Sequence, residues 1–287
     1  MMILPDFYVD ELIKKAITED INYIDVSSAY LFGDDHRTEA YFVSKADGVL
    51  CGIDIAMRVF SLLDNTFEYT LYKHDGDELK AGDLIAEFSG KTLRLLEGER
   101  TSLNLVQHMS GIATMTNVAV KAVEGTGTSI ADTRKTLPGL RAIQKYAVTC
   151  GGGHNHRYNL SDAAMLKDNH IDAGGGITKT VEALRKKIGH TVKIEVETRT
   201  LDEVKEAVSA GADIIMLDNM NNEQMAECVK FIDGRAKTEA SGNITLDNIA
   251  ARLSFESNVL DIANVVGVLL LAAIPEINTV IGKQIAL

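Results

Sequence analysis

The residues best suited to chemistry form a short basic stretch within an acidic chain. The chain has 41 acidic and 29 basic residues and a net charge of −12, which argues against a general nucleic-acid binder or a protein of anionic membranes. Residues 134–167 differ, because they hold one acid, Asp162, and six bases: Arg134, Lys135, Arg141, Lys145, Arg157 and Lys167. Such cations bind carboxylates and phosphates if they converge, and otherwise form a solvated basic face.

A glycine-rich loop lies in the same stretch. Residues 151–157 read Gly-Gly-Gly-His-Asn-His-Arg, and glycines let backbone N–H groups approach an anion closely. The loop matches neither the dinucleotide pattern GxGxxG nor the phosphate-loop pattern GxxxxGKS/T. His154 and His156 could ligate a metal ion, but no carboxylate or cysteine lies at ligand spacing from them. We therefore expect no transition-metal site.

Two carboxylates and a glycine turn extend this set. Glu197 and Asp218 end successive predicted strands, where they can hold Mg²⁺ or ribose hydroxyls, or stabilise positive charge at a sugar carbon. They could equally form salt bridges to the basic residues. Ser241-Gly242-Asn243 precedes a helix-like stretch at 246–250, which predicts either a phosphate site or an ordinary helix cap. Together these features indicate chemistry on a sugar phosphate with a polyanionic partner.

Alternating strands and helices must position these groups. Short apolar strands are predicted at 128–133, 163–168, 192–198 and 212–218, with helices at 178–188 and 201–210. This succession is typical of a parallel sheet, and the polar residues that follow each strand would meet at one end of an α/β barrel. A helix cap explains one such residue, but not four in succession.

The first hundred residues have a different pattern, which predicts a small α+β unit. We expect an amphipathic helix over 7–18, a strand over 39–50 that turns at Asp47-Gly48, and further glycine turns at 75–77 and 81–83. Residues 97–123 are helix-prone, and we expect one or two helices broken near Ser110-Gly111.

Composition bounds the class of protein. With 287 residues, 46% apolar and 24% charged, the chain is globular, with two domains or an α/β barrel plus an appendage. Its three cysteines lie far apart and form no CxxC motif, which indicates a reducing compartment. We expect no signal peptide, and the longest apolar run, 265–274, is too short to span a membrane. We therefore expect a cytoplasmic protein.

Several long motifs resemble one known family, that of quinolinate phosphoribosyltransferase. They are DTRKTLPGLR (132–141), GGGHNHRYNLSDAAMLKDNH (151–170), IEVET (194–198), IIMLDNM (214–220) and EASGNITLDNI (239–249), with ITEDINYIDVSS (17–28), GVLCGIDIAMRVF (48–60) and LEGERTSLNLVQHMSGIATMT (96–116) in the first half. The resemblance runs in order from about residue 11 to residue 250. It implies an incomplete TIM-like α/β barrel at 111–274 and an α+β open-sandwich domain at 1–110, on which a tail at about 275–287 would dock.

The resemblance also implies an activity. The family joins quinolinate to phosphoribosyl pyrophosphate (PRPP) in the presence of Mg²⁺, releases pyrophosphate and CO₂, and forms nicotinate mononucleotide for NAD biosynthesis. It implies a homodimer or hexamer with shared active sites. Lys135, Lys167, Glu197 and Asp218 would be catalytic, and the last two would also hold the ribose hydroxyls and the metal.

The remaining roles follow from the same resemblance. Arg134, Lys135, His156, Arg157 and Lys167 would bind the quinolinate carboxylates and the pyrophosphate, and Thr133 would donate from the same strand end. Ser241, Gly242 and Asn243 would hold the 5′-phosphate. Arg100 would reach the site across the dimer interface.

One departure keeps alternatives open. Residues 251–287 lack the glycine-alanine-leucine-threonine-type turn that completes the family's phosphate site, and Val266-Gly267-Val268 is the nearest candidate. An inactive or divergent superfamily member, such as a molybdenum-associated homologue, is therefore the first alternative. The second is a Schiff-base aldolase that uses Lys135 or Lys167, which would require a desolvated lysine.

Overall fold

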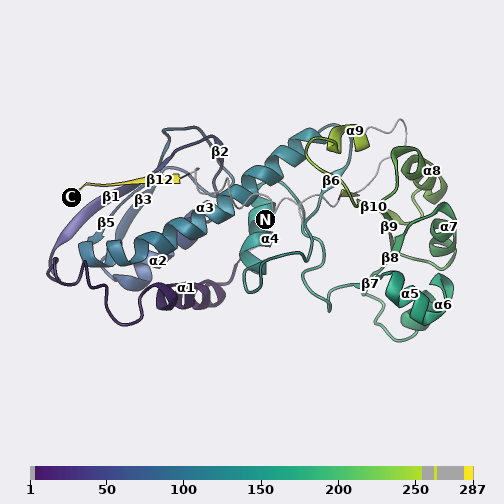
Figure 1. Cartoon of the computed structure of the whole chain (residues 1–287), viewed down its shortest axis with the longest axis horizontal. Coiled ribbons are helices and arrows are strands. Elements are labelled where there is room, and N and C mark those ends of the chain that lie inside the picture. The colour runs from purple at the N-terminus through teal and green to yellow at the C-terminus, as the bar shows by residue number, and fades with distance from the viewer. Residues whose placement is uncertain (1–3, 254–261, 264–280, 287) are drawn as a thin grey trace. The chain divides into compact units, whose positions relative to one another are not determined.

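The computed structural model describes residues 4–253, 262–263 and 281–286 (Figure 1). The chain forms two compact units. The first contains the described residues of 1–117, 137–152 and 270–287, and the second contains those of 118–136 and 153–269. The units thus alternate along the chain, whereas the sequence alone suggests a division near residue 110. The run at 265–274 and Val266-Gly267-Val268 lie outside the described residues.

An antiparallel sheet forms the centre of the first unit. Its strand order is β12-β1-β5-β3, with β12 at Ile281–Ala286, β1 at Arg37–Ser44, β5 at Leu84–Lys91 and β3 at Glu68–Leu71. Burial alternates along the second half of β1, as expected of a strand with one face against a core. The pairing of β12 with β1 runs from Ser44↔Ile281 to Glu39↔Ala286. The last described strand therefore joins the sheet of this unit.

Aromatic residues fill the core of this unit. Phe42, Phe60 and Phe88 are buried, and their ring centroids lie 5.0–6.4 Å apart. Phe60 comes from α2 (Ile53–Leu63), whose apolar positions recur at helical spacing. The unit also contains α1 (Asp6–Asp20), α4 (Arg141–Cys150) and the short pair β2 (Gly48–Val49) and β4 (Glu78–Leu79). The predicted opening helix and small α+β unit are confirmed.

A single helix, α3 (Thr92–Ala122), spans 31 residues. The predicted break near Ser110-Gly111 is wrong. Ser110 Oγ accepts a hydrogen bond from the backbone N–H of Cys51 at 2.9 Å and donates to its carbonyl at 3.1 Å. The hydroxyl thus bonds to a neighbouring loop rather than competing for its own helix backbone. Among the described residues, no helix has the length and apolar character that a membrane span requires.

The second unit is built on a parallel sheet, as the sequence predicts. Its strand order is β6-β11-β10-β9-β8-β7, and every pairing is parallel. The strands are β6 (Ser129–Ile130), β7 (Ala164–Leu166), β8 (Ile194–Thr198), β9 (Ile214–Asp218), β10 (Lys237–Ser241) and β11 (Ile262–Ala263). A parallel bridge between Ala131 and His154 continues the sheet beyond β6. This is the order of an incomplete α/β barrel.

Helices follow the strands along one face of this sheet (Figure 1). They are α5 (Asp168–Gly174), α6 (Ile177–Arg185), α7 (Leu201–Ser209) and α8 (Asn222–Ile232), and the short α9 (Ile249–Leu253) follows β10 in the chain. The predicted helices at 178–188 and 201–210 correspond to α6 and α7. Val196, Ile215 and Ala240 are fully buried in the strands. Because side chains alternate along a strand, the residues on either side of these three point to the opposite face.

Candidate functional site

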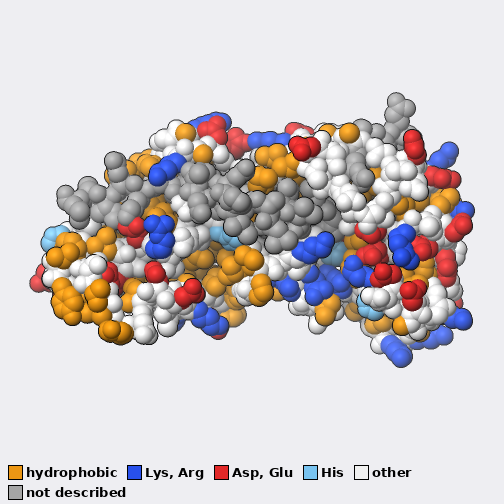
Figure 2. All heavy atoms as spheres, in the orientation of Figure 1, with side chains coloured by type: hydrophobic (Ala, Val, Ile, Leu, Met, Phe, Trp, Pro, Cys, Tyr) orange, Lys and Arg blue, Asp and Glu red, His pale blue; other side chains and the backbone are white. Residues whose placement is uncertain are grey.

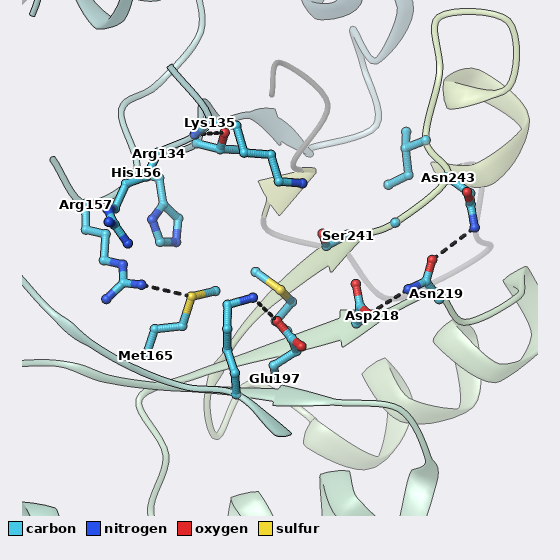
Figure 3. A pocket seen from close by; sticks show the side chains of 15 residues that line it. Arg134, Lys135, His156, Arg157, Met165, Glu197, Asp218, Asn219, Ser241 and Asn243 are labelled. Carbon is cyan, nitrogen blue, oxygen red and sulfur yellow. Dashed lines mark hydrogen bonds and ion pairs between the residues drawn. The ribbon is translucent and has the colours of Figure 1, made fainter. Parts of the chain in front are cut away.

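A pocket of about 530 Å³ opens on that opposite face, at the carboxyl ends of the strands (Figure 3). Every predicted site residue except Arg100 lines it: Thr133, Arg134, Lys135, His156, Arg157, Lys167, Glu197, Asp218, Ser241, Gly242 and Asn243. Met165, Met216, Asn219 and Ile244 complete the lining. The polar groups that follow separate strands do meet, so the predicted convergence is confirmed for them.

Three members of the predicted sets lie elsewhere. Arg141 and Lys145 are on α4 in the first unit, where Lys145 is 1% exposed. Arg100 is an exposed residue of α3 in the same unit, and its role across a subunit interface stays a prediction. Figure 2 shows Lys and Arg side chains gathered in one area of the visible surface, in a molecule whose surface also carries many acidic groups.

One wall of the pocket is cationic. Arg157 donates to the carbonyl of Ala163 at 3.0 Å and to Met165 Sδ at 3.3 Å, which holds its guanidinium in place. Burial and the neighbouring charge of Arg134 lower the pKa of Arg157. The Nε of Arg134 is buried and has no hydrogen-bond partner among the described residues. A buried N–H without an acceptor is costly, so this wall is suited to an anionic ligand.

An ion pair lies at the ends of β7 and β8. Lys167 Nζ is 2.6 Å from Glu197 Oε2, and the register that pairs Leu166 with Val196 explains why the two residues adjoin. The Lys167 side chain is 48% exposed. An imine-forming lysine needs desolvation, whereas this one is hydrated and paired with a carboxylate. The geometry therefore argues against the aldolase interpretation for Lys167, and Lys135 is exposed as well.

The turn after β10 has a conformation that glycine and asparagine permit. Gly242 has φ 87° and Asn243 has φ 55°, both in the left-handed region. A Cβ at Gly242 would overlap Asn219 Oδ1. The backbone N–H of Asn219 donates to the Ser241 carbonyl at 2.9 Å, and the side-chain Nδ2 of Asn243 donates to Asn219 Oδ1 at 3.0 Å. The turn is thus fastened to the end of β9.

The helix-like stretch after this turn begins later than predicted. Residues 246–248 form a turn in which Asn248 Oδ1 accepts from the Thr245 N–H at 2.8 Å, and α9 starts at Ile249. Asn248 Nδ2 also donates to the Asn243 carbonyl at 2.9 Å. Asparagine side chains favour such local bonds over helix, which accounts for the shift.

Two buried carboxylates near His156 were missed by the sequence analysis. His156 Nε2 lies 3.0 Å from Glu195 Oε2 and 3.4 Å from Glu239 Oε2, and the two acids are 1% and 0% exposed. Burial disfavours charge on the imidazole, but the nearby carboxylates of Glu195 and Glu239 outweigh it and raise the pKa of His156 to about 10. Burial together with Glu195 raises the pKa of Glu239.

No carboxylate lies at ligand spacing from His156 along the sequence, but in the folded chain two carboxylates lie close to its ring. The three ligand atoms lie within 4.8 Å of one another, because β8 and β10 bring the acids to the loop that carries His156. The strand periodicity held a usable signal. Glu195 and Glu239 precede Glu197 and Ser241 by two residues, which places them on the same face one layer deeper.

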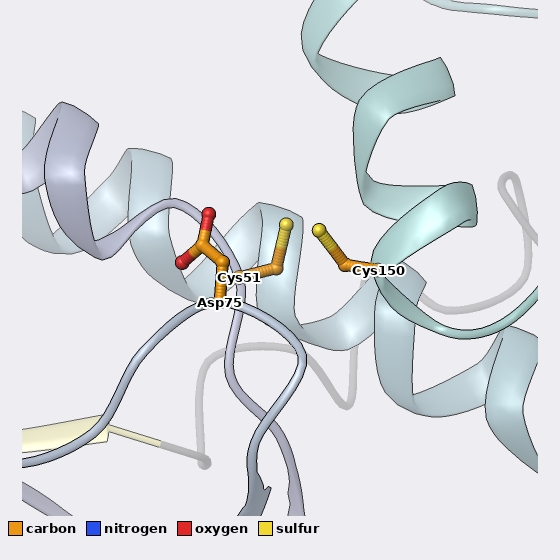
Figure 4. A group of neighbouring side chains, drawn as sticks. All are labelled: Cys51, Asp75 and Cys150. Atoms are coloured by element: carbon orange, nitrogen blue, oxygen red, sulfur yellow. The ribbon is translucent and has the colours of Figure 1, made fainter. Parts of the chain in front are cut away.

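The first unit contains a second cluster of ionisable side chains, Cys51, Asp75 and Cys150, in which Cys51 is fully buried (Figure 4). Its ligand atoms also lie within 4.8 Å of one another. Asp75 Oδ1 accepts from the Ile53 N–H at 3.0 Å, and Oδ2 accepts from the Tyr146 hydroxyl at 2.8 Å. Burial raises the pKa of both Cys51 and Asp75, while the hydrogen bonds to Asp75 act in the opposite direction on its carboxyl group.

Comparisons with known proteins agree with this geometry. Residues 25–110 and 112–268 match the N- and C-terminal domain models of quinolinate phosphoribosyl transferase. A probable nicotinate-nucleotide pyrophosphorylase (carboxylating) of Bacillus subtilis is 46% identical over 241 residues, which are 84% of this chain and 83% of that protein. One from Synechocystis is 45% identical over 250 residues, 86% of this chain and 84% of that protein. The crystal structure of NadC from Streptococcus pyogenes superposes on this chain with a TM-score of 0.92 at 38% sequence identity. The match covers 100% of this chain and 98% of the NadC chain.

Proposed function

The chain belongs to the quinolinate phosphoribosyl transferase family, and we propose that its pocket transfers the phosphoribosyl group of PRPP to quinolinate. The products are nicotinate mononucleotide, pyrophosphate and CO₂, in a step of NAD biosynthesis. The observation that carries this assignment is the convergence of five basic side chains and two carboxylates on one pocket at the strand ends. The substrates carry two carboxylates, a phosphate and a pyrophosphate, so the chemistry of the lining suits them.

In this proposal the cationic wall binds quinolinate. Arg134, His156 and Arg157 provide donors for its two carboxylates, and the Nε of Arg134 offers a buried N–H without a partner among the described residues. Thr133 lies beside them, and its Oγ1 accepts from the Lys135 N–H at 2.9 Å. That bond shapes the turn after β6. Guanidinium groups favour planar carboxylates, which would fix the orientation of the pyridine ring.

The opposite side of the pocket binds the sugar phosphate. The Ser241-Gly242-Asn243 turn, fastened to Asn219, takes the 5′-phosphate. Lys135 and Lys167 take the pyrophosphate, and Glu197 and Asp218 hold the ribose hydroxyls. Asp218 Oδ2 already accepts from Asn219 Nδ2 at 2.7 Å, so one side chain connects the hydroxyl site and the phosphate turn.

The donor set also fits Mg²⁺, which the family requires. Glu197 and Asp218 are carboxylates on neighbouring strand ends, and a hard cation of this kind is commonly held by one or two carboxylates, water and substrate phosphates. When bound, Mg²⁺ would offset the charge of the departing pyrophosphate. In this structure Glu197 accepts a hydrogen bond from Lys167. We therefore propose that Glu197 and Asp218 hold the Mg²⁺ ion only once the substrate is bound and its pyrophosphate engages Lys167.

The chain's own residues act by positioning and by charge stabilisation. As the C1–pyrophosphate bond breaks, positive charge develops at the ribose carbon, and Glu197 and Asp218 stabilise it. The pyridine nitrogen then bonds to C1 while the cationic wall holds the ring in line. The adduct then loses its 2-carboxylate as CO₂, and the electron pair left on C2 takes up a proton from water to form the product's C2–H bond. No side chain needs to act as a covalent nucleophile.

A coupled assay tests the activity. Purified protein is incubated with quinolinate, PRPP and Mg²⁺, and nicotinate mononucleotide and CO₂ are measured together. We expect both products in equal amounts, and omission of Mg²⁺ should abolish them. Folded protein that forms neither product would contradict the assignment and favour a divergent superfamily member, the alternative raised by residues 251–287.

We propose further that the protein is a homodimer or hexamer in which Arg100 completes the neighbour's site. An exposed arginine on α3, outside the unit that contains the pocket, supports this role. Arg100→Ala and Lys167→Ala subunits should each have much reduced activity, and mixed oligomers should regain part of it. If mixed oligomers are verified and show no regained activity, Arg100 acts within its own subunit rather than at the neighbour's site.

The reducing cytoplasm is the compartment we propose. Cys51, Cys150 and Cys228 are all buried free thiols, and none forms a disulfide.

A further inference from the structure

We propose that Asn219 is a positioning residue that aligns the Ser241-Gly242-Asn243 turn with Asp218, so that the pocket selects phosphorylated sugars over other phosphate monoesters. Asn219 lines the pocket and is a neutral residue among its charged ones. The inference rests on the proposed function and deepens it, because it concerns how the sugar phosphate is recognised. The effect of Asn219 would pass through Asp218 and the turn.

The strand register places the two parts of the sugar site side by side. Asp218 ends β9 and Ser241 ends β10, and the two residues are partners in the parallel sheet. The backbone N–H of Asn219 donates to the Ser241 carbonyl at 2.9 Å, which continues the pairing beyond the strands. Neighbouring strands lie about 4.8 Å apart, so the carboxylate and the start of the turn are held within one strand spacing.

Both ends of the Asn219 side chain are in use (Figure 3). Its Nδ2 donates to Asp218 Oδ2 at 2.7 Å, and its Oδ1 accepts from Asn243 Nδ2 at 3.0 Å. A hydrogen bond to a carboxylate is charge-assisted and therefore among the stronger ones. One amide thus orients the acid on one side and holds the turn on the other.

The backbone around this amide is adapted to it. Asn219 has φ 56°, in the left-handed region that asparagine adopts more readily than most residues. Gly242 lies against the amide, and a Cβ there would overlap Asn219 Oδ1. The space that glycine leaves open is therefore the space that the Asn219 side chain occupies.

This alignment favours a ligand that carries both a hydroxyl and a phosphate. In the proposed function, Asp218 takes a ribose hydroxyl and the turn takes the 5′-phosphate. Because the two sites are held in place before binding, a sugar phosphate engages both without the cost of ordering them. A phosphate monoester without a sugar engages the turn alone and gains nothing from Asp218.

A purely structural role is the competing explanation, in which Asn219 only keeps the turn folded. The turn has other support, however. Asn248 Nδ2 donates to the Asn243 carbonyl at 2.9 Å, and the bond to the Ser241 carbonyl comes from the Asn219 backbone. Neither bond needs the Asn219 side chain. Loss of that side chain should therefore misalign the turn rather than unfold it.

Asn219→Gly provides the test, since glycine permits the left-handed backbone and removes only the amide. Binding of ribose 5-phosphate and of ethyl phosphate to the full chain is measured by titrations followed by ³¹P NMR. The variant should bind ribose 5-phosphate about fivefold to tenfold more weakly, the effect of one or two lost hydrogen bonds. Its affinity for ethyl phosphate should change less than about twofold.

Asp233→Gly is the matched control, because Asp233 also has a left-handed backbone, with φ 47°, and lies outside the pocket lining. It should change neither affinity, and thermal unfolding verifies that both variants are folded. In the coupled assay, Asn219→Gly should raise the KM for PRPP and leave that for quinolinate within about twofold.

Equal losses for the two phosphate ligands would establish the structural role and overturn the inference. Unchanged affinity for ribose 5-phosphate in the variant, or a wild type that does not prefer ribose 5-phosphate to ethyl phosphate, would overturn it as well. A wild type that fails the coupled assay but shows a preference that Asn219→Gly removes would contradict the proposed activity and still support the inference.

Discussion

Two buried clusters of ionisable side chains differ in what they can do. In each, three ligand atoms lie within 4.8 Å of one another. His156 lines a pocket, and the buried carboxylates of Glu195 and Glu239 lie 3.0 Å and 3.4 Å from its Nε2. Around Cys51, Asp75 and Cys150, burial instead favours neutral groups, and both oxygens of Asp75 already accept hydrogen bonds.

The difference shows that proximity of ionisable groups does not by itself make a site. The cluster of His156, Glu195 and Glu239 adjoins a cavity where several other charged side chains meet. In the cluster of Cys51, Asp75 and Cys150, hydrogen bonds of Asp75 join its loop to α2 and α4. We therefore expect changes near the pocket to affect binding and catalysis, and changes near Cys51 to affect stability.

The largest expected effect is that of Lys167→Ala. Removal of a cation that stabilises the departing pyrophosphate should lower kcat/KM about 10²- to 10³-fold. The unfolding temperature should also fall, because the variant leaves Glu197, whose side chain is only 14% exposed, without its cation. Steady-state kinetics and thermal unfolding measure both values. A near-normal kcat/KM in this variant would contradict the expectation that changes near the pocket affect catalysis.

A smaller and more selective effect is expected for Arg134→Ala. Loss of its charge-assisted hydrogen bonds should weaken quinolinate binding about tenfold to a hundredfold, and PRPP binding less than threefold. Calorimetric titration with each substrate separates the two. Equal losses for both ligands would remove Arg134 from the quinolinate wall and leave its buried Nε unexplained.

The smallest effect concerns the other cluster and its pH dependence. Burial raises the pKa of Asp75 above its ordinary value of 3.8. Between 3.8 and the raised value, the folded protein holds a proton that the unfolded chain has lost, so the free energy of unfolding falls as pH rises. Asp75→Asn should remove this slope and leave kcat unchanged. Urea unfolding from about pH 4 to 7 measures it, and an identical slope in the variant would show that another group is responsible.

Much of the pocket was predictable because polar residues follow the strands directly. Lys167, Glu197 and Asp218 each come after an apolar run, and parallel strands bring such residues to one edge. Glu195 and Glu239 were missed because they lie two residues before Glu197 and Ser241, away from the strand ends that drew attention. Their importance depends on the registers that place β8, β9 and β10 side by side.

Local signals were misleading where distant contacts override them. Ser110 and Gly111 predict a helix break, yet the Ser110 hydroxyl bonds both the N–H and the carbonyl of Cys51 and the helix continues. Arg141 and Lys145 belong to the same basic stretch of sequence but lie on α4 in the first unit, away from the bases that converge. Charge density along a sequence does not specify which unit a segment joins.

The ion pair of Lys167 and Glu197 has a consequence for selectivity. A simple anion that binds Lys167 leaves Glu197 without its cation, so free phosphate gains one contact at the loss of another. A ligand that presents an anionic group to the lysine and hydroxyl donors to the carboxylate satisfies both at once. A ligand must therefore offer both an anionic group and hydroxyl groups to bind well. The pocket should for this reason bind a sugar that carries pyrophosphate more tightly than it binds free pyrophosphate.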